Sequence, residues 1–593
     1  MVKQIHPLFP LLLLAAIMLG ACASPPTIED PVVISKTDDP LSLEILALVD
    51  AIEQGQLDVV TELARFHQQA STSNHYSLLA YANAKRHLAL DNEENAYLAL
   101  NNRFSQHHLM LAASDTQNRV TLLNARILEA RGQLLTAIRL RVFLAPLLDD
   151  EHAYQDNHLK IWNLLSHLDT LSIDLSVFQQ EQVLTQWLTL SRLTQDPGLS
   201  LEEQLFAIER WQMQYPDHPA SLMPPPIIGK MYEALMLRPQ QIAVILPLDG
   251  RYRSHGIAIR DGIMQAYYQS GHKSQILFYA FDEMDGFLDI YHEAIYDGAE
   301  LVIGPLFKNQ LEELYTFPVL PVPTIALNRL DGEQTGIRPH NLYEFSLAID
   351  DEIDSIIRLA THEQHHNAII IHQKDDWAIR AAERFNTQWR QQGRQILDQT
   401  GFERSQGQSA IVQRALNIDS SNQRNRELQW LTGLSVEHEP RRRQDIDMIL
   451  LLARQEAATS IRPLLAFHYA GDVPIYANSS VYRGYPRPSV DGDLNGIRFT
   501  DIPLVINPQP QIGINNPYAE SAMIRMYAFG IDAFRLTERI QLMAQMPQAA
   551  MYGATGRLSI EQNNVRRQTA YAQFRRGRIV PIILTPGETE VWP

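Results

Sequence analysis

Two histidines and a glutamate in the second half of the chain have the spacing of a zinc-protease motif. The run His362-Glu363-Gln364-His365-His366 matches H-E-x-x-H, in which both histidines bind zinc and the glutamate acts as general base. Apolar residues between Ile353 and Ala360 predict a helix that begins in an acidic run. The histidines then fall in its last turn, where imidazole suits the negative helix end. A strand at 368–371 follows at once and leaves no turn for a third ligand, so we expect no catalytic zinc.

A second short motif, Ser270-Gly271-His272-Lys273, has the S-x-x-K spacing of a serine nucleophile with a lysine base. It stands beside a glycine at a predicted helix end, with no supporting serine or lysine motif downstream, and we interpret it as a solvated loop. The chain has no G-x-S-x-G, phosphate-binding loop or G-x-G-x-x-G motif. We therefore expect no catalytic residues, no metal and no cofactor.

The ends of the predicted strands are the remaining place for chemistry, because open α/β sheets bind ligands at their carboxyl edges. Two interpretations stay open for the residues there. They could hold a small ligand between two lobes, with helix N-termini receiving an anion. They could instead serve turns in an inherited cleft that is empty or filled by loops. The candidate cleft residues are Asp249, Gly250, Gly304, Pro305, Asn328, Arg329, Asn478 and Ser479.

The single cysteine, Cys22, follows a positive residue, a short apolar run at 8–19 and the small pair Gly20-Ala21. The run is too short to span a membrane and predicts a signal peptide at residues 1–21. Leu19 to Cys22 resembles the lipobox of bacterial lipoproteins, which implies that Cys22 receives the lipid anchor. Ala23 in the next position, instead of aspartate, implies sorting to the outer membrane, on its periplasmic side. Residues 22–40, rich in Ser, Pro and Thr, predict a flexible tether.

Composition sets the class of the remaining chain. The 593 residues are 45% hydrophobic and 20% charged, an ordinary globular balance for more than one domain. The formal net charge of −18 argues against a nucleic-acid partner, which needs a cationic face.

Residues 41–238 have the apolar periodicity of helices. Turns at Gly55, at Asp91-Asn92 and at Gly132 recur at intervals of roughly 40 residues, which predicts helical hairpins of the tetratricopeptide kind. An irregular helical bundle is the alternative. Either arrangement typically offers a binding surface.

Residues 239–593 change to alternating strands and helices. Continuous apolar runs at 242–246, 301–303, 368–371 and 448–452 are typical of buried parallel strands, and amphipathic stretches separate them. The pattern is long for a single lobe and fits two α/β lobes better than one. Asn563-Asn564 between two short strands predicts a hairpin.

Several segments of this half resemble the type I periplasmic-binding-protein fold: 242–250 with the following helix, Gly304-Pro305-Leu306 after a strand, and 553–558. A closer resemblance is to the LpoA family of penicillin-binding-protein activators. It is carried by Pro305-Leu306, 323–330, 461–465, 469–472, 493–499 and 553–558. The resemblance implies a tetratricopeptide-like domain followed by a two-lobed binding-protein-like domain.

This resemblance implies a role that is not enzymatic. The resemblance implies an outer-membrane lipoprotein that reaches a class A bifunctional penicillin-binding protein and stimulates peptide cross-linking of peptidoglycan. A periplasmic solute receptor of the type I class is the alternative function. The long helical part favours the activator, because a receptor needs only the two lobes; which small molecule would bind, if any, stays unknown.

Overall fold

The computed structural model describes residues 39–148, 150–271, 273–281, 286–330, 338–403, 407–434, 441–508, 516–546 and 549–583. The chain separates into two compact units. The first ends at Arg131 and the second begins at Gly132. Each unit is described by itself.

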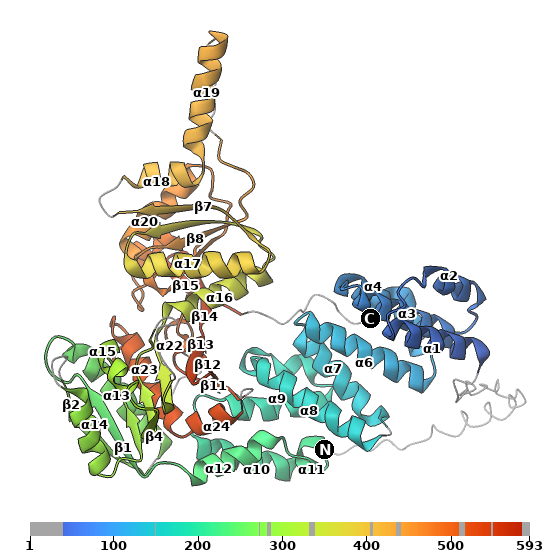
Figure 1. Cartoon of the computed structure of the whole chain (residues 1–593), viewed down its shortest axis with the longest axis horizontal. Helices are drawn as coiled ribbons and strands as arrows, with labels where there is room; N and C mark the ends of the chain where they lie inside the picture. Colours follow the sequence, from blue (N-terminus) through green and yellow to red (C-terminus); the bar gives the residue numbers. More distant parts are fainter. Residues whose placement is uncertain are drawn as a thin grey trace, which may run out of the picture. The chain divides into compact units, whose positions relative to one another are not determined.

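The first unit is helical throughout its described residues (Figure 1, blue). Its helices are α1 (Pro40–Glu53), α2 (Val60–Gln69), α3 (Ser73–Ala89), α4 (Glu93–Asn101), α5 (Arg103–Met110) and α6 (Ser114–Ala130). Polar residues begin several of these helices. Asp39 accepts hydrogen bonds from two N–H groups of the first turn of α1, and Asn92 caps α4 in the same way. Helix α3 lies at the centre, because α1, α4, α5 and α6 all pack against it.

The predicted turns of the helical part are confirmed by backbone geometry. Gly55 has φ +95°, Asp91 has φ +53° and Gly132 has φ +73°. These left-handed values end α1, α3 and α6, and they explain why glycine and aspartate stand where a side chain with a branched Cβ would be strained.

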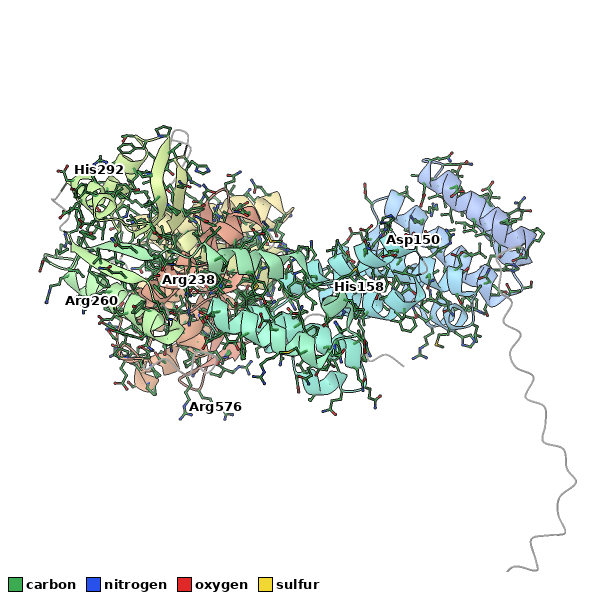
Figure 2. The ribbon with its side chains drawn as sticks, turned by 90° about the horizontal axis from the view of Figure 1, so that it is seen from below. Asp150, His158, Arg238, Arg260, His292 and Arg576 are labelled. Carbon is green, nitrogen blue, oxygen red and sulfur yellow. The ribbon has the colours of Figure 1, made fainter. Side chains whose placement is uncertain are left out.

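The second unit begins with further helices, here called the helical segment: α7 (Leu134–Leu144), α8 (Glu151–His167), α9 (Gln182–Gln195), α10 (Leu201–Gln214), α11 (Pro219–Leu222) and α12 (Pro226–Met236), with short 3-10 turns at Ala145–Leu147, Thr170–Ser172 and Leu175–Phe178. Its core contains two buried histidines, His158 and His218, beside Trp187. Figure 2 labels His158 on α8. Burial lowers the pKa of each histidine to about 4.

The first lobe is built on an eight-stranded sheet with the order β11-β12-β13-β5-β4-β3-β1-β2. Alternate residues of β1 face opposite sides. Val244 joins a core with Ile259 and Ile263 of α13, while Ala243 and Ile245 join a second core with α14 and α15. The elements are β1 (Gln241–Leu246), α13 (Arg253–Ser270), β2 (Gln275–Ala280), α14 (Phe287–Tyr296), β3 (Leu301–Ile303), α15 (Lys308–Leu314), β4 (Val319–Ala326), β5 (His340–Phe345), α23 (Ile524–Thr537), α24 (Ile540–Gln545), β11 (Met551–Tyr552), β12 (Arg557–Glu561) and β13 (Asn564–Gln568).

Two glycines let α13 and α23 cross at close range on one face of this sheet. A Cβ on Gly262 would lie 2.0 Å from the carbonyl oxygen of Tyr527, and one on Gly530 would lie 2.0 Å from that of Ile259. Any larger residue at either position would push the two helices apart.

The second lobe has a seven-stranded sheet with the order β15-β14-β10-β9-β8-β6-β7. Helices cover both faces, with α16 and α17 over one and α18 and α20 over the other. The elements are α16 (Ile349–His362), β6 (Asn367–Gln373), α17 (Asp376–Gln391), β7 (Gln395–Phe402), α18 (Gln408–Ala415), α19 (Ile418–Thr432), β8 (Met448–Leu452), α20 (Gln455–Phe467), β9 (Ile475–Ala477), α21 (Pro488–Asp491), β10 (Arg498–Asp501), α22 (Pro503–Ile506), β14 (Ala570–Arg575) and β15 (Arg578–Ile582), with 3-10 turns at Ser479–Val481 and Gly492–Leu494.

The predicted fold class is therefore confirmed: a helical part is followed by two α/β lobes. Within each sheet the central strands are parallel, and antiparallel strands from the C-terminal region complete both sheets. Among the described residues no helix is both long and apolar enough to cross a membrane.

The compact units divide the chain at Gly132, because the helical segment is bonded to the first lobe. The Arg557 guanidinium donates to the carbonyl of Ser166 over 2.8 Å, and Arg539 donates to the side-chain carbonyl of Gln204 over 2.9 Å. The division by element type that the sequence predicts, 41–238 and 239–593, stays a prediction.

Candidate functional site

The H-E-x-x-H run lies at the end of a helix, as its context predicts. Helix α16 ends at His362, Gln364 adopts a left-handed φ of +63°, and β6 begins at Asn367. Among the described residues no group of three or more His, Cys, Asp or Glu is arranged to hold a metal ion.

Glu363 of that run has structural partners instead. Its carboxylate accepts a hydrogen bond from the hydroxyl of Tyr476 and lies 2.7 Å from the guanidinium of Arg498. His365 shares the same hydroxyl at 2.8 Å. Burial raises the pKa of Glu363, but the hydrogen bonds of His365 and Tyr476 and the charge of Arg498 outweigh it, so that the pKa lies below its ordinary value. These contacts tie the end of α16 to β9 and β10.

The S-x-x-K run also ends a helix. Ser270 is the last residue of α13 and its hydroxyl donates to the carbonyl of Tyr267 over 2.9 Å. Lys273 is exposed shortly after the left-handed Gly271, and His272 lies outside the described residues. The serine and the lysine therefore stand at the end of a helix and in the loop that follows, as predicted.

The candidate cleft residues of the first lobe follow strands β1, β3 and β4. Asp249 and Gly250 are exposed in the turn after β1, while Gly304 and Pro305 are buried after β3 and joined by a cis peptide bond. Asn328 donates from its amide to the carbonyl of Leu306 over 2.7 Å, and so fixes the loop after β4 to the loop after β3.

Arg329, the next residue, is buried at the junction between the two lobes. Its guanidinium lies 3.5 Å from both Asp350 and Asp351 at the start of α16. Asp351 also lies 3.5 Å from Arg567, and each of these two side chains is only 1% exposed. Burial raises the pKa of Asp351, while the charges of Arg567, Arg329 and Arg566 oppose that shift.

Ser479, one of the two candidate residues of the second lobe, contacts the same helix. The backbone N–H and the hydroxyl of Ser479 donate to the carboxylate of Glu352 over 2.9 and 3.0 Å. Asn478 is buried and donates to Ser480 over 3.0 Å. The carbonyl of Ser479 accepts from Arg525 of α23. Burial raises the pKa of Glu352 despite these contacts.

The structure thus gathers Arg329 and Ser479 on the acidic N-terminus of α16, with Asp351, Glu352 and Arg567 as their partners. We call these five residues the junction cluster. Sequence reasoning missed the last three. The run 350–352 pointed only to a helix start, and nothing in the sequence pairs it with an arginine so far along the chain. Among the described residues, no hydrogen bond or ion pair joins Asp249, Gly250, Gly304 or Pro305 to the cluster, and a role for any candidate residue in ligand binding stays a prediction.

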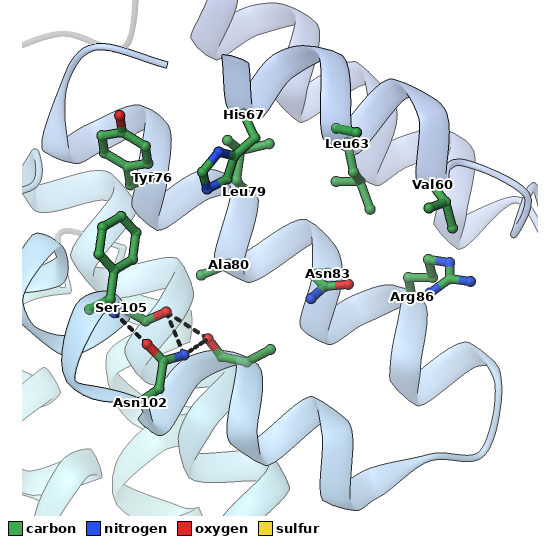
Figure 3. A pocket seen from close by; sticks show the side chains of 13 residues that line it. Val60, Leu63, His67, Tyr76, Leu79, Ala80, Asn83, Arg86, Asn102 and Ser105 are labelled. Atoms are coloured by element: carbon green, nitrogen blue, oxygen red, sulfur yellow. Dashed lines mark hydrogen bonds between the residues drawn. The ribbon is translucent and has the colours of Figure 1, made fainter. Parts of the chain in front are cut away.

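A groove crosses the first unit, with a volume of about 370 Å³ (Figure 3). Helix α3 forms its floor, α2 one wall, and the end of α4 with the start of α5 the other. It is lined by Val60, Leu63, Ala64, His67, Tyr76, Leu79, Ala80, Asn83, Arg86, Ala99, Asn102, Phe104 and Ser105. Sequence reasoning predicted a binding surface here without its residues. The spacing of Val60, Leu63, Ala64 and His67 along one helix face was the available signal.

A second exposed apolar surface lies at the end of α19, which projects from the second lobe (Figure 1, orange). Trp430 is 84% exposed and Leu431 is 70% exposed, with Leu428 and Leu434 beside them in sequence. Only Ile418 and Ser421 of this helix are buried. We call the four exposed residues the α19 tip. Isolated exposed apolar residues are ordinary, but a tryptophan among leucines is typical of a protein contact.

Cys22 and the predicted tether up to residue 38 lie outside the described residues, so that lipidation of Cys22 stays a prediction. The last two residues of the predicted tether are part of a helix instead, because Asp39 caps α1 and Pro40 begins it. Residues 28–577 match the model of a family described as "LppC putative lipoprotein".

Curated relatives extend over both parts of the chain. The penicillin-binding protein activator LpoA of Photobacterium profundum is 28% identical over 476 residues, which cover 78% of this chain and 76% of the relative. LpoA of Vibrio cholerae strain O395 is 27% identical over 442 residues, covering 72% and 71%. A crystal structure of Haemophilus influenzae LpoA shares the fold, with a TM-score of 0.50 and 21% identity over 92% of this chain and 95% of that one. Because the family model covers most of the sequence, the chain belongs to the LppC lipoprotein family.

Proposed function

We propose that this chain binds and activates a class A bifunctional penicillin-binding protein, and that it thereby stimulates peptide cross-linking of peptidoglycan. The observation that carries this proposal is the match to penicillin-binding protein activators over about three quarters of both chains. A likeness limited to the α/β lobes would fit a solute receptor equally well. This one extends into the helical part, for which a receptor has no use.

The junction cluster supports the same choice. Two residues that would meet a small ligand between the lobes already have partners: Arg329 forms an ion pair with Asp351 at 3.5 Å, and Ser479 donates a hydrogen bond to Glu352. A ligand would have to replace these contacts, because buried charges and donors need partners. The apolar side chains of the α19 tip are exposed among the described residues, as a protein-binding surface requires.

The test is a reconstituted reaction. The chain from Ala23 onward is added to a purified class A synthase with lipid-linked substrate, and cross-linked muropeptides are counted. We expect more cross-links and direct binding to the synthase. If cross-linking does not increase and no binding to the synthase is detected, the proposal is wrong. If an amino acid or a sugar instead raises the melting temperature strongly, the result would favour the solute receptor.

We further propose that Cys22 carries the lipid anchor and that the protein is held in the outer membrane, on its periplasmic side. Membership of a lipoprotein family supports the lipid anchor, and Ala23, in place of aspartate, supports sorting to the outer membrane. Mass spectrometry of the N-terminal peptide is expected to show acyl chains, and density fractionation is expected to place the protein with outer-membrane markers. Cys22→Ser should release it; an unchanged distribution of that variant would contradict the anchor.

Finally, we propose that the chain acts without a catalytic centre of its own. Glu363, the candidate base of the H-E-x-x-H run, already contacts Tyr476 and Arg498. Glu363→Gln is therefore expected to activate the synthase as well as the parent chain does. A complete loss of activation with retained folding would show that Glu363 has a chemical role.

A further inference from the structure

The groove of the first unit combines apolar walls with one polar end. Val60, Leu63 and Ala64 of α2 face Leu79 and the rest of the α3 floor (Figure 3). Leu63 packs partly against the core that contains Phe66, whereas Val60 and Ala64 are exposed. Val60 is 52% exposed, and Phe104 on the opposite wall is also 52% exposed. The walls therefore present apolar surface that a ligand could cover.

Arg86 and Asn83 stand at one end of the α3 floor. The Nε of Arg86 donates to the carbonyl of Leu57 over 3.0 Å, which fixes the side chain. No carboxylate of the described residues lies within ion-pair distance of its guanidinium, and Asn83 has no hydrogen bond among them. A guanidinium held in place beside a free carboxamide fits a carboxylate, which can accept from two donors at once.

Aromatic rings stand at the other end. Tyr76 contacts Phe104 with ring centroids 5.2 Å apart, and His67 with centroids 5.6 Å apart. The hydroxyl of Tyr76 donates to the carbonyl of Ala70 over 3.0 Å, so that this ring is fixed too. From Tyr76 to Arg86 the α3 floor rises roughly 15 Å, at ~1.5 Å per residue. An extended peptide of about four or five residues has this length.

Asn102 keeps the second wall rigid. Its side-chain oxygen accepts from the N–H of Ser105 over 2.9 Å, and its amide donates to the carbonyl of Ala99 over 3.2 Å (Figure 3). It thereby caps α5 and holds the end of α4 at the same time. A preformed groove loses little entropy when it binds.

We propose that this groove binds a short extended segment of a partner protein, with aliphatic side chains against Val60, Leu63 and Phe104 and one acidic side chain at Arg86. Charge selects this occupant, because Arg86 has no carboxylate partner among the described residues, and the apolar walls fit aliphatic neighbours. An acyl chain would satisfy the walls but leave the guanidinium without a partner. Peptide binding here would hold whether or not the chain activates a synthase.

The test uses the whole chain from Ala23 onward. Fluorescein-labelled, amidated pentapeptides of leucine, valine and glycine carry one glutamate in each position in turn, and a matched set carries glutamine. Anisotropy is expected to show saturable binding of at least one glutamate peptide, with about tenfold weaker binding of its glutamine partner. Arg86→Gln should remove that preference. Arg126→Gln, which changes an exposed arginine on α6 outside the groove, should keep it.

The walls are tested by a second matched pair. Val60→Asp should weaken binding of the glutamate peptide at least tenfold. Leu98→Asp, which changes a residue of similar exposure at 50% outside the groove, should not. Circular dichroism confirms that each variant is folded.

Three results would overturn the proposal: no peptide binds, glutamate and glutamine peptides bind equally, or both aspartate variants behave alike. Tight binding of a fluorescent fatty acid in competition with the peptides would assign the groove to an acyl chain. Self-association that Val60→Asp abolishes would assign it to a second copy of the chain.

Discussion

Asp351→Asn is the sharpest test of the junction between the lobes. The substitution keeps the shape of the side chain, so that it creates no cavity, and removes only the charge. Loss of one partner from a buried ion pair typically costs about 3–5 kcal/mol, because the other charge stays buried. Arg567 would keep its hydrogen bonds to the carbonyls of Ala348 and Thr555, at 3.1 and 3.3 Å. Arg329 would keep Asp350 at 3.5 Å. We therefore expect the lower end of the range, about 3 kcal/mol.

The assay is urea unfolding followed by fluorescence, with hydrogen exchange of peptides that cover 345–355 and 565–570. The free energy of unfolding should fall and exchange should increase at both segments, although they lie far apart in the sequence. Glu520→Gln is the matched control, because Glu520 is exposed and has no partner among the described residues. The double variant Asp351→Asn with Arg567→Met should regain at least about 1 kcal/mol, since one buried charge is then removed with its partner. If the free energy of unfolding of Asp351→Asn lies within about 0.5 kcal/mol of that of the control, the junction cluster does not hold the two lobes together.

Three further variants test other parts of the structure. His158 has a pKa of about 4 in the folded chain, so folding stability is lost as the pH falls from about 6.5 to about 4. His158→Phe should remove up to roughly 3 kcal/mol of that loss, measured by urea titrations at pH 7 and pH 4.5. Glu363 has a lowered pKa, so its contribution to folding stability is present above the ordinary carboxyl pKa and is lost as the pH falls below it. Glu363→Gln should therefore lower the free energy of unfolding at pH 7 and make its decrease below about pH 4.5 less steep. An unchanged decrease below that pH would contradict this prediction. Trp430→Ser with Leu431→Ser should weaken synthase activation at least tenfold, whereas Tyr296→Ser, which changes an aromatic residue 92% exposed on the first lobe, should leave activation unchanged.

Local signals were sufficient to predict most elements of the fold. The apolar run at 242–246 is β1, and Gly55, Asp91 and Gly132 end helices as expected. The hairpin near the C-terminus shows where local signals stop. Its turn residues are Gln562 and Asn563, with φ of +48° and +61°, and Asn564 pairs with Glu561 in the ladder. The expected Asn563-Asn564 turn is thus displaced by one residue.

The reason is that side-chain burial sets the register. The observed ladder buries Leu558 and Val565 completely. A slip by one residue would turn the apolar side chains of one strand to the opposite face. Placing a glutamine in a left-handed conformation is the smaller cost.

Contacts between distant residues could not be predicted in this way. The sequence places a domain boundary where helices give way to strands, but Arg539 and Arg557 bond the helical segment to the first lobe. Both arginines are remote from their partners in the sequence, and no short pattern indicates the pairing. The junction cluster was missed for the same reason, although Arg329 and Ser479 were identified from their positions at strand ends.

The groove and the junction cluster differ in what they leave for a ligand. At the junction, each buried charge already lies beside an opposite charge or a hydrogen-bond donor. A bound molecule would have to break these contacts, so that its own contacts would add little net free energy of binding. In the groove, Arg86 has a fixed side chain and no carboxylate among the described residues, and the walls keep Val60 and Phe104 half exposed. A ligand gains the full burial of those walls together with a charge-assisted hydrogen bond. Among the described residues, the groove therefore offers a ligand more than the junction cluster does, in line with the peptide-binding proposal.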